Sequence, residues 1–206
     1  NEDMAATAVW GTQQLNLYPD ATKQGVFAMW YGKGPGVDRS GDVFKHGNLA
    51  GTSPHGGVLL LAGDDHTCKS STTAHQSEYA FVDAMIPVLN PAGVQEFLDL
   101  GIYGWAMSRY SGCWVAYKTV AETVDSSASV HVDPHRIQVS LPTDFMMPED
   151  GLNIRWPDEF LAQEERLHKH KLYAALAFAR TNRLDKTVID SPKKHLGIVT
   201  TGKSYL

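Results

Sequence analysis

The sequence is poor in cysteine, in positive charge and in long apolar runs, and each shortage excludes a class of protein. Only two cysteines, Cys68 and Cys113, occur among 206 residues, which is too few for a disulfide framework or a four-cysteine iron–sulfur cluster. We therefore expect reduced thiols in a cytoplasmic protein. The net charge of −5 and the absence of a Lys/Arg-rich run argue against a nucleic-acid-binding protein. No apolar run reaches the ~18 residues that cross a bilayer, so we expect no membrane partner.

The apolar runs that are present predict an α/β fold with a parallel sheet and helices on both of its faces. Strands are expected at 25–32, 56–63, 85–90, 113–120 and 136–141, and helices at 2–15, 43–51, 74–85, 92–110 and 158–184. The run "GGVLLLAG" is apolar on both faces, which is typical of a central strand of a parallel sheet. Strands that alternate with helices favour this fold class. The glycine-rich stretch 32–42 reads as a loop.

Composition changes along the chain predict three parts. Residues 1–141 form one domain, and 142–195 form a linker with a long amphipathic helix. The stretch "HLGIVTTG" predicts a strand, so 196–206 are expected to begin a following α/β domain. We interpret the chain as a piece of a longer polypeptide whose first domain is truncated at its start.

A dense polar segment, "GDDHTCKSSTTAHQSE", ends the central apolar run. Asp64, Asp65, His66, Cys68 and His75 are all possible metal ligands, although no zinc-type spacing occurs. Cys68 beside histidine and lysine could be a nucleophile, and free N–H groups at a helix start could bind an anion. If the segment has only a structural role, Ser70–Thr73 cap a helix, and Asp64 and Asp65 are solvated. The residues alone leave these alternatives open.

Several segments, taken in order, resemble bacterial indolepyruvate ferredoxin oxidoreductase, a large enzyme of the 2-oxoacid:ferredoxin oxidoreductase superfamily. They are "NEDMAATAVWG", "YGKGPGVDRSGDVFKHGNLAGTSPHGGVLLLAGDDHTCKSSTTAHQSE", "PVLNPAGVQEFLDLG" and "IDSPKKHLGIVTTGKSYL". The resemblance covers essentially the whole chain. It implies a thiamine-diphosphate-binding fold of the pyrimidine type, which holds the aminopyrimidine ring of the cofactor.

The same resemblance places the rest of the cofactor site elsewhere. A partner domain of the diphosphate type, in the same enzyme, would hold the diphosphate and Mg²⁺. Its G-D-G motif with a distant Asn does not occur here, so no metal ligand is expected in this chain. Iron–sulfur clusters would lie elsewhere in the parent protein, which is expected to be a dimer.

The resemblance also assigns residues. Glu2 opens the Ala-rich helix, where a carboxylate is favoured by the helix dipole in any case. By resemblance it becomes the catalytic glutamate, which binds N1′ of the aminopyrimidine and favours the imino tautomer that activates thiazolium C2. The cofactor-binding residues implied are Tyr31, Gly32, Lys33, Asp64, His66, Ser70 and Ser71.

The implied reaction joins a 2-oxoacid, coenzyme A and oxidised ferredoxin to give acyl-CoA, CO₂ and reduced ferredoxin. In it the cofactor carries out the decarboxylation and the protein positions and polarises it. Two alternatives stand beside it. One is a non-catalytic interaction domain of the same fold. The other is a small metal-dependent hydrolase built on Asp64, Asp65 and His66.

Overall fold

The computed structural model describes residues 1–206 and contains a four-stranded sheet in which every strand is parallel to its neighbours. The strands are β1 (Ala28–Lys33), β2 (Val58–Asp64), β3 (Val88–Leu89) and β4 (Val115–Val120). Their order across the sheet is β1-β2-β4-β3. The expected α/β class is therefore confirmed, with β2 and β4 at the centre and β1 and β3 at the edges.

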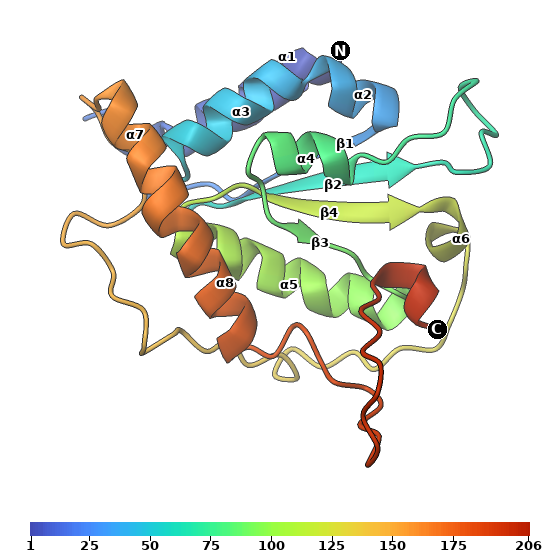
Figure 1. The fold of residues 1–206 in the computed structure, drawn as a ribbon. Helices are drawn as coiled ribbons and strands as arrows, with labels where there is room; N and C mark the ends of the chain where they lie inside the picture. Colours follow the sequence, from blue (N-terminus) through green and yellow to red (C-terminus); the bar gives the residue numbers. More distant parts are fainter.

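Helices cover both faces of this sheet (Figure 1). One face carries α1 (Glu2–Gln13), α2 (Gly34–Arg39), α3 (Gly41–Ala50) and α4 (Glu78–Asp83). The other face carries α5 (Val94–Ser111) and α8 (Leu172–Thr181). The two cores between these layers meet opposite sides of the same strands. Trp30, Leu60 and Trp114 point to the first core, whereas Leu59 and Val115 point to the second.

The stretch 32–42, expected to be a loop, contains a helix. Pro35 occupies the first turn of α2, where its missing N–H has no partner to lose. Phe44 of α3 then packs edge-on against Trp30, with ring centroids 4.9 Å apart. Gly51, with φ +103°, ends α3. Gly34 and Gly36 of this stretch leave room for the side chains of His75 and Glu2 against α2.

Two helices begin later than their sequence patterns suggest. The expected helix at 74–85 is α4, which starts at Glu78 with Ser77 as its N-cap. The expected helix at 92–110 is α5, which starts at Val94 after Gly93 and ends at Gly112 in the left-handed conformation. In both cases the turn-forming residues at the start of the expected range form a loop, and the helix begins only after them.

The strand expected at 136–141 is not formed. Residues 125–157 run without helix or strand, and Val139 and Leu141 are exposed. Arg136 is tied by an ion pair to Asp99 of α5, which holds the segment on the helical layer and away from the sheet. A strand needs a neighbouring strand for its backbone hydrogen bonds, and none lies beside this segment.

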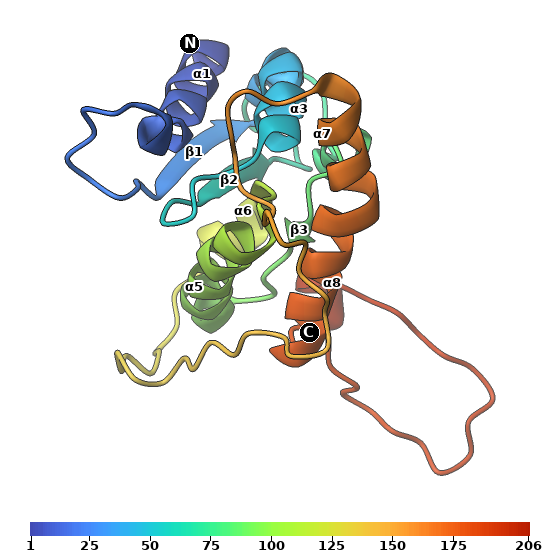
Figure 2. The ribbon, with the colours of Figure 1, turned by 90° about the vertical axis from the view of Figure 1, so that its left-hand side faces the viewer.

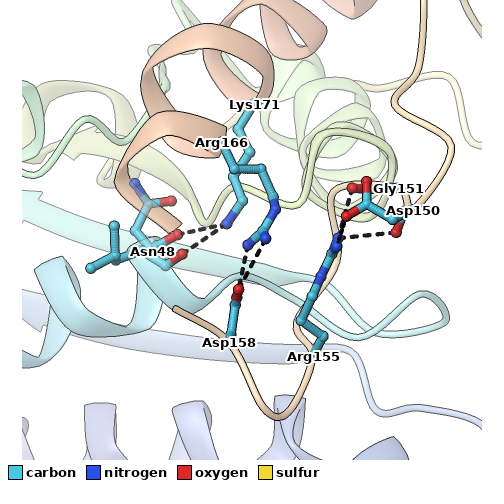
Figure 3. Close-up of polar contacts among 8 residues, drawn as sticks. Asn48, Asp150, Gly151, Arg155, Asp158, Arg166 and Lys171 are labelled. Carbon is cyan, nitrogen blue, oxygen red and sulfur yellow. Dashed lines mark hydrogen bonds and ion pairs between the residues drawn. The ribbon is translucent and has the colours of Figure 1, made fainter. Parts of the chain in front are cut away.

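The long helix expected at 158–184 is present as α7 (Phe160–Arg166), a π-helical turn (Leu167–Lys171) and α8. The turn brings Lys171 fully inside, where its Nζ donates to the carbonyls of Asn48 at 3.1 Å and Leu49 at 3.0 Å (Figure 3). Beside it the largely buried Arg166–Asp158 pair is 2.8 Å long. These contacts dock the helix on the end of α3, so it is packed into the core.

Three short elements and an extended segment complete the chain. A 3₁₀ turn, η1 (Leu15–Leu17), follows α1, and α6 (Ala121–Val124) follows β4. Residues 182–201 extend away from the body (Figure 2). The strand expected at 195–202 is not formed, because no strand pairs with it and Leu196, Ile198 and Val199 are exposed. A second 3₁₀ turn, η3 (Gly202–Tyr205), ends the chain. No helix is both long and apolar enough to cross a membrane.

Candidate functional site

The carboxyl ends of the strands gather most of the candidate residues. The amino terminus, α2, the loop 65–77 and α6 all lie at this edge of the sheet (Figure 1). Parallel α/β sheets bind ligands at this edge because loops of several strands converge there. The fold thus brings Glu2, the end of β1 and the polar loop to one region of the molecule.

Glu2 lies against α2. Its backbone carbonyl accepts a hydrogen bond of 2.9 Å from the indole Nε1 of Trp30. Its side-chain stem lies on Gly36, where an added Cβ would be 2.8 Å from Glu2 Cγ. Its Oε2 is 3.4 Å from a guanidinium nitrogen of Arg39, and its side chain is 40% exposed. The carboxylate is therefore oriented by α2 and still reachable from solvent.

The start of the polar loop is fastened to β1 by Asp65. Its carboxylate is 3.1 Å from Lys33 Nζ and accepts a hydrogen bond of 3.0 Å from the Ser70 N–H. Lys33 Nζ also donates to the Ser70 carbonyl. Desolvation tends to raise the pKa of Asp65, but the hydrogen bonds from Ser70 and Lys33 outweigh it and lower the pKa to about 2. The loop is thereby closed over the ends of two neighbouring strands.

Asp64 points inward and has a structural role. Its side chain is fully buried and accepts hydrogen bonds from the N–H and the hydroxyl of Ser77, at 2.9 and 2.5 Å. Lys118 Nζ lies 3.3 Å from Asp64 Oδ2 and 2.5 Å from Glu78 Oε2. Burial acts to raise the pKa of Glu78, and its hydrogen bond from Lys118 lowers it overall. This cluster joins the end of β2 to the start of α4 through β4.

His75 ties the far end of the loop to α2. Its ring packs on Gly34, where an added Cβ would be 2.2 Å from the His75 ring. Its Nε2 lies 3.2 Å from Asp38 and its Nδ1 lies 3.1 Å from the Thr73 carbonyl. Because Glu2 also contacts α2, this helix joins the glutamate to the loop.

The remaining predicted residues are spread over this edge. Gly32 faces the Trp30 ring. Tyr31 is 79% exposed and points away from the core that contains Trp30. His66 and Ser71 are exposed on the loop, and Ser71 has φ +82°. Positive φ at Ser71 and at Cys68 is uncommon for residues with a side chain, so the loop has a specific, mildly strained shape.

An open hollow lies beside Asp65 and its contacts with Lys33 and Ser70. Its walls are contributed by the ends of β1, β2 and β4, the loop and α6, with Lys33, Asp65, Lys69, Thr119 and Asp125 among the lining residues. Lys69 is 3.8 Å from Asp125 across it. Both charge signs are present, so the hollow selects neither anions nor cations by net charge. No group of three or more His, Cys, Asp or Glu side chains is placed to hold a metal ion.

No role was expected for Arg39, Lys118 or Asp38, and His75 was considered only as a possible metal ligand. A lysine inside the apolar run "CWVAYKTV" is a detectable signal, because a buried lysine needs an acidic partner or other hydrogen-bond acceptors. Arg39 and Asp38 carry no comparable signal, since charged residues are common in a glycine-rich stretch.

Comparison of the chain with protein-family models, with curated proteins and with solved structures gives no match.

Proposed function

We propose that this chain is the pyrimidine-side domain of a thiamine-diphosphate-dependent 2-oxoacid:ferredoxin oxidoreductase, most similar to the indolepyruvate enzyme. The sequence segments that resemble this family suggest it, and a parallel α/β sheet is compatible with it. The observation that carries the proposal is the position of Glu2. Its carboxylate is fixed on α2 at the carboxyl edge of the sheet and remains partly exposed.

The residues at this edge fit the pyrimidine end of the cofactor. Glu2 offers a carboxylate with a single charged neighbour, Arg39, so one carboxylate oxygen is free to bind a ring nitrogen. Met4, two residues after Glu2 in α1, and Tyr31, near the end of β1, are both exposed, and each offers apolar surface to an uncharged aromatic ring. We assign the diphosphate and its Mg²⁺ to a partner domain of the same enzyme.

The role of the chain follows from these residues. When bound, thiamine diphosphate supplies a nucleophilic carbon and an electron sink for the decarboxylation of a 2-oxoacid. Glu2 would hold the proton at N1′ of the pyrimidine ring, through a charge-assisted hydrogen bond.

Lys33, Asp65 and Ser70 would hold the polar loop over the carboxyl ends of the strands. Asp64, which is buried beneath the loop, would support it there. His66 and Ser71 would face the substrate side of the rim. Iron–sulfur clusters, coenzyme A and ferredoxin would be bound by other parts of the dimeric enzyme, in the cytoplasm.

The activity of the intact enzyme tests this proposal. Glu2→Gln should lower the rate of ferredoxin reduction by 2-oxoacid and coenzyme A by roughly 10²-fold or more. Asp3→Asn is the matched control, because Asp3 lies in the same first turn of α1 and its loss removes the same favourable interaction with the helix dipole. Equal activities for the two variants would mean that Glu2 is only a helix-start carboxylate.

A further inference from the structure

Two residues of α2, Gly36 and Arg39, contact Glu2 in different ways. Gly36 leaves room for the side-chain stem, since any Cβ at this position would approach Glu2 Cγ to 2.8 Å. Arg39, three residues further along the same helix, reaches Oε2 with its guanidinium at 3.4 Å. Residues three apart share a face of a helix. The face of α2 that bears them is therefore shaped to the glutamate by steric fit and by charge.

Glu2 is held at its other end as well. Its carbonyl accepts the indole N–H of Trp30 at 2.9 Å, and Trp30 is buried in the core against Phe44. The backbone of Glu2 is thus fixed to β1, which leaves only its side-chain torsions free. The contacts with α2 are those that select among the remaining rotamers.

We infer that Gly36 and Arg39 are positioning residues for the carboxylate of Glu2. Gly36 keeps the stem flat on α2, and Arg39 orients Oε2 so that Oε1 is presented outward. This inference rests on the proposed function, because positioning has a catalytic meaning only if Glu2 acts on the cofactor. Neither residue needs to touch the cofactor or the substrate.

The steric part predicts an unusual separation of stability from activity. The nearest atoms that a Cβ at Gly36 would meet all belong to the Glu2 side chain, which can rotate away. Gly36 does not have a positive φ, and alanine is a better helix former than glycine. Gly36→Ala should therefore fold with an unchanged or higher melting temperature while it displaces the carboxylate of Glu2.

A matched control lies a few residues away. Gly41, the first residue of α3, has no atom within 4 Å of an added Cβ, so Gly41→Ala makes the same chemical change without meeting Glu2. For the charge, Lys45→Gln is the counterpart of Arg39→Gln, because Lys45 forms a similarly exposed ion pair with Asp83 at 2.6 Å. Arg39→Lys keeps a cation at the position and should restore part of the loss.

The experiment has one readout without cofactor and one with it. Crystal structures of the cofactor-free protein should show Glu2 rotated away from α2 in Gly36→Ala and in its place in Gly41→Ala. In the intact enzyme loaded with thiamine diphosphate and Mg²⁺, hydrogen–deuterium exchange at C2 should slow roughly 10-fold or more in Gly36→Ala and Arg39→Gln, since a displacement on the order of 1 Å can cost up to 10²-fold.

The outcomes separate the two proposals. A slow Glu2→Gln variant beside Gly36→Ala at the wild-type rate would remove the positioning role and leave the proposed function intact. An unmoved Glu2 in the Gly36→Ala crystal structure would also overturn the inference. If Glu2→Gln exchanges at the wild-type rate, the proposed function fails and the positioning role fails with it.

Discussion

Lys118 Nζ lies 3.3 Å from Asp64 Oδ2 in the interior of the protein, with 7% and 0% of the two side chains exposed. The pair links the central strands β2 and β4 below the polar loop. Removal of one partner from a buried pair leaves an uncompensated charge, which costs far more than the pair itself contributes. The loop above the pair therefore depends on two charges that do not face the site.

Substitution of Lys118 tests this dependence. Lys118→Met should lower the free energy of unfolding by about 3 kcal/mol or more, measured by urea denaturation. Asp64→Asn combined with Lys118→Met should recover part of that loss, because the fully buried carboxylate left without its lysine is then absent as well. Lys45→Met removes a lysine from an exposed pair and should change the stability by no more than about 0.5 kcal/mol. A Lys118→Met protein as stable as Lys45→Met would refute the buried-pair role.

The buried Lys171 gives the protein a stability that rises in alkaline solution. Burial lowers the pKa of Lys171 from 10.5 to about 8. Between these values the unfolded chain binds more protons than the folded one, so the free energy of unfolding rises with pH through this window. At ~1.4 kcal/mol per pKa unit the rise is at most about 3.5 kcal/mol. Lys171→Met should lack it.

Cys113 must be removed to measure that effect cleanly. Burial raises the pKa of its thiol to about 11, so above the ordinary value of 9.0 the unfolded thiol ionises first and stability falls. The two effects have opposite signs in overlapping windows. The comparison is therefore Cys113→Ala against Cys113→Ala with Lys171→Met, by denaturant titration from pH 7 to pH 10.5. Parallel curves would show that Lys171 retains its ordinary ionisation when folded.

Acid should break the contacts of the Asp65 carboxylate with Lys33 and Ser70. The folded pKa of Asp65 is about 2, against 3.8 normally, so the contribution of the carboxylate is present above 3.8 and is lost as the pH falls towards 2. The amide nitrogen of Ser70, which donates to Asp65, should report this in NMR spectra with a midpoint near 2. The step should be missing in Asp65→Asn. A midpoint near 4 would mean that Lys33 and Ser70 do not hold the carboxylate.

The assignment of the diphosphate to a partner domain predicts weak binding by this chain by itself. Calorimetric titration with thiamine diphosphate and Mg²⁺ should give no measurable heat of binding at micromolar cofactor. Most of the binding free energy of the cofactor would come from the partner domain, whose oxygen ligands would hold Mg²⁺ and the diphosphate. Micromolar affinity would show that the chain has been assigned to the wrong half of the cofactor site.

The sequence predicted the sheet well because its strands are short apolar runs bounded by turn residues. Val58 to Ala62 are all apolar, and all of them except Leu61 are buried in the structure. The strand at 136–141 was wrong because alternation of apolar residues also occurs in a coil that packs on a helix. The burial of Lys171 could not be predicted, since it depends on a π-helical turn that shifts the buried face of the helix.

The structure places several of the candidate residues at one edge of the sheet, and their roles in binding or catalysis stay predictions. The polar loop does follow the central strand, and Glu2 does lie at the same edge. Asp64 was expected at the rim, yet it faces inward, because β2 is covered on both sides and its final side chain falls on the Ser77 and Lys118 side. Contacts between segments distant in sequence, such as Glu2 with Arg39, leave no local pattern from which they could be inferred.

The most direct test of the proposed function is the rate at which C2 of bound thiamine diphosphate exchanges its hydrogen for deuterium. The rate is measured by NMR after quenched mixing of the intact enzyme with D₂O. Glu2→Gln is expected to slow this exchange by roughly 10²-fold or more while cofactor affinity falls less, because a proton-transfer group has been removed. An exchange rate equal to that of the wild type in Glu2→Gln would contradict it.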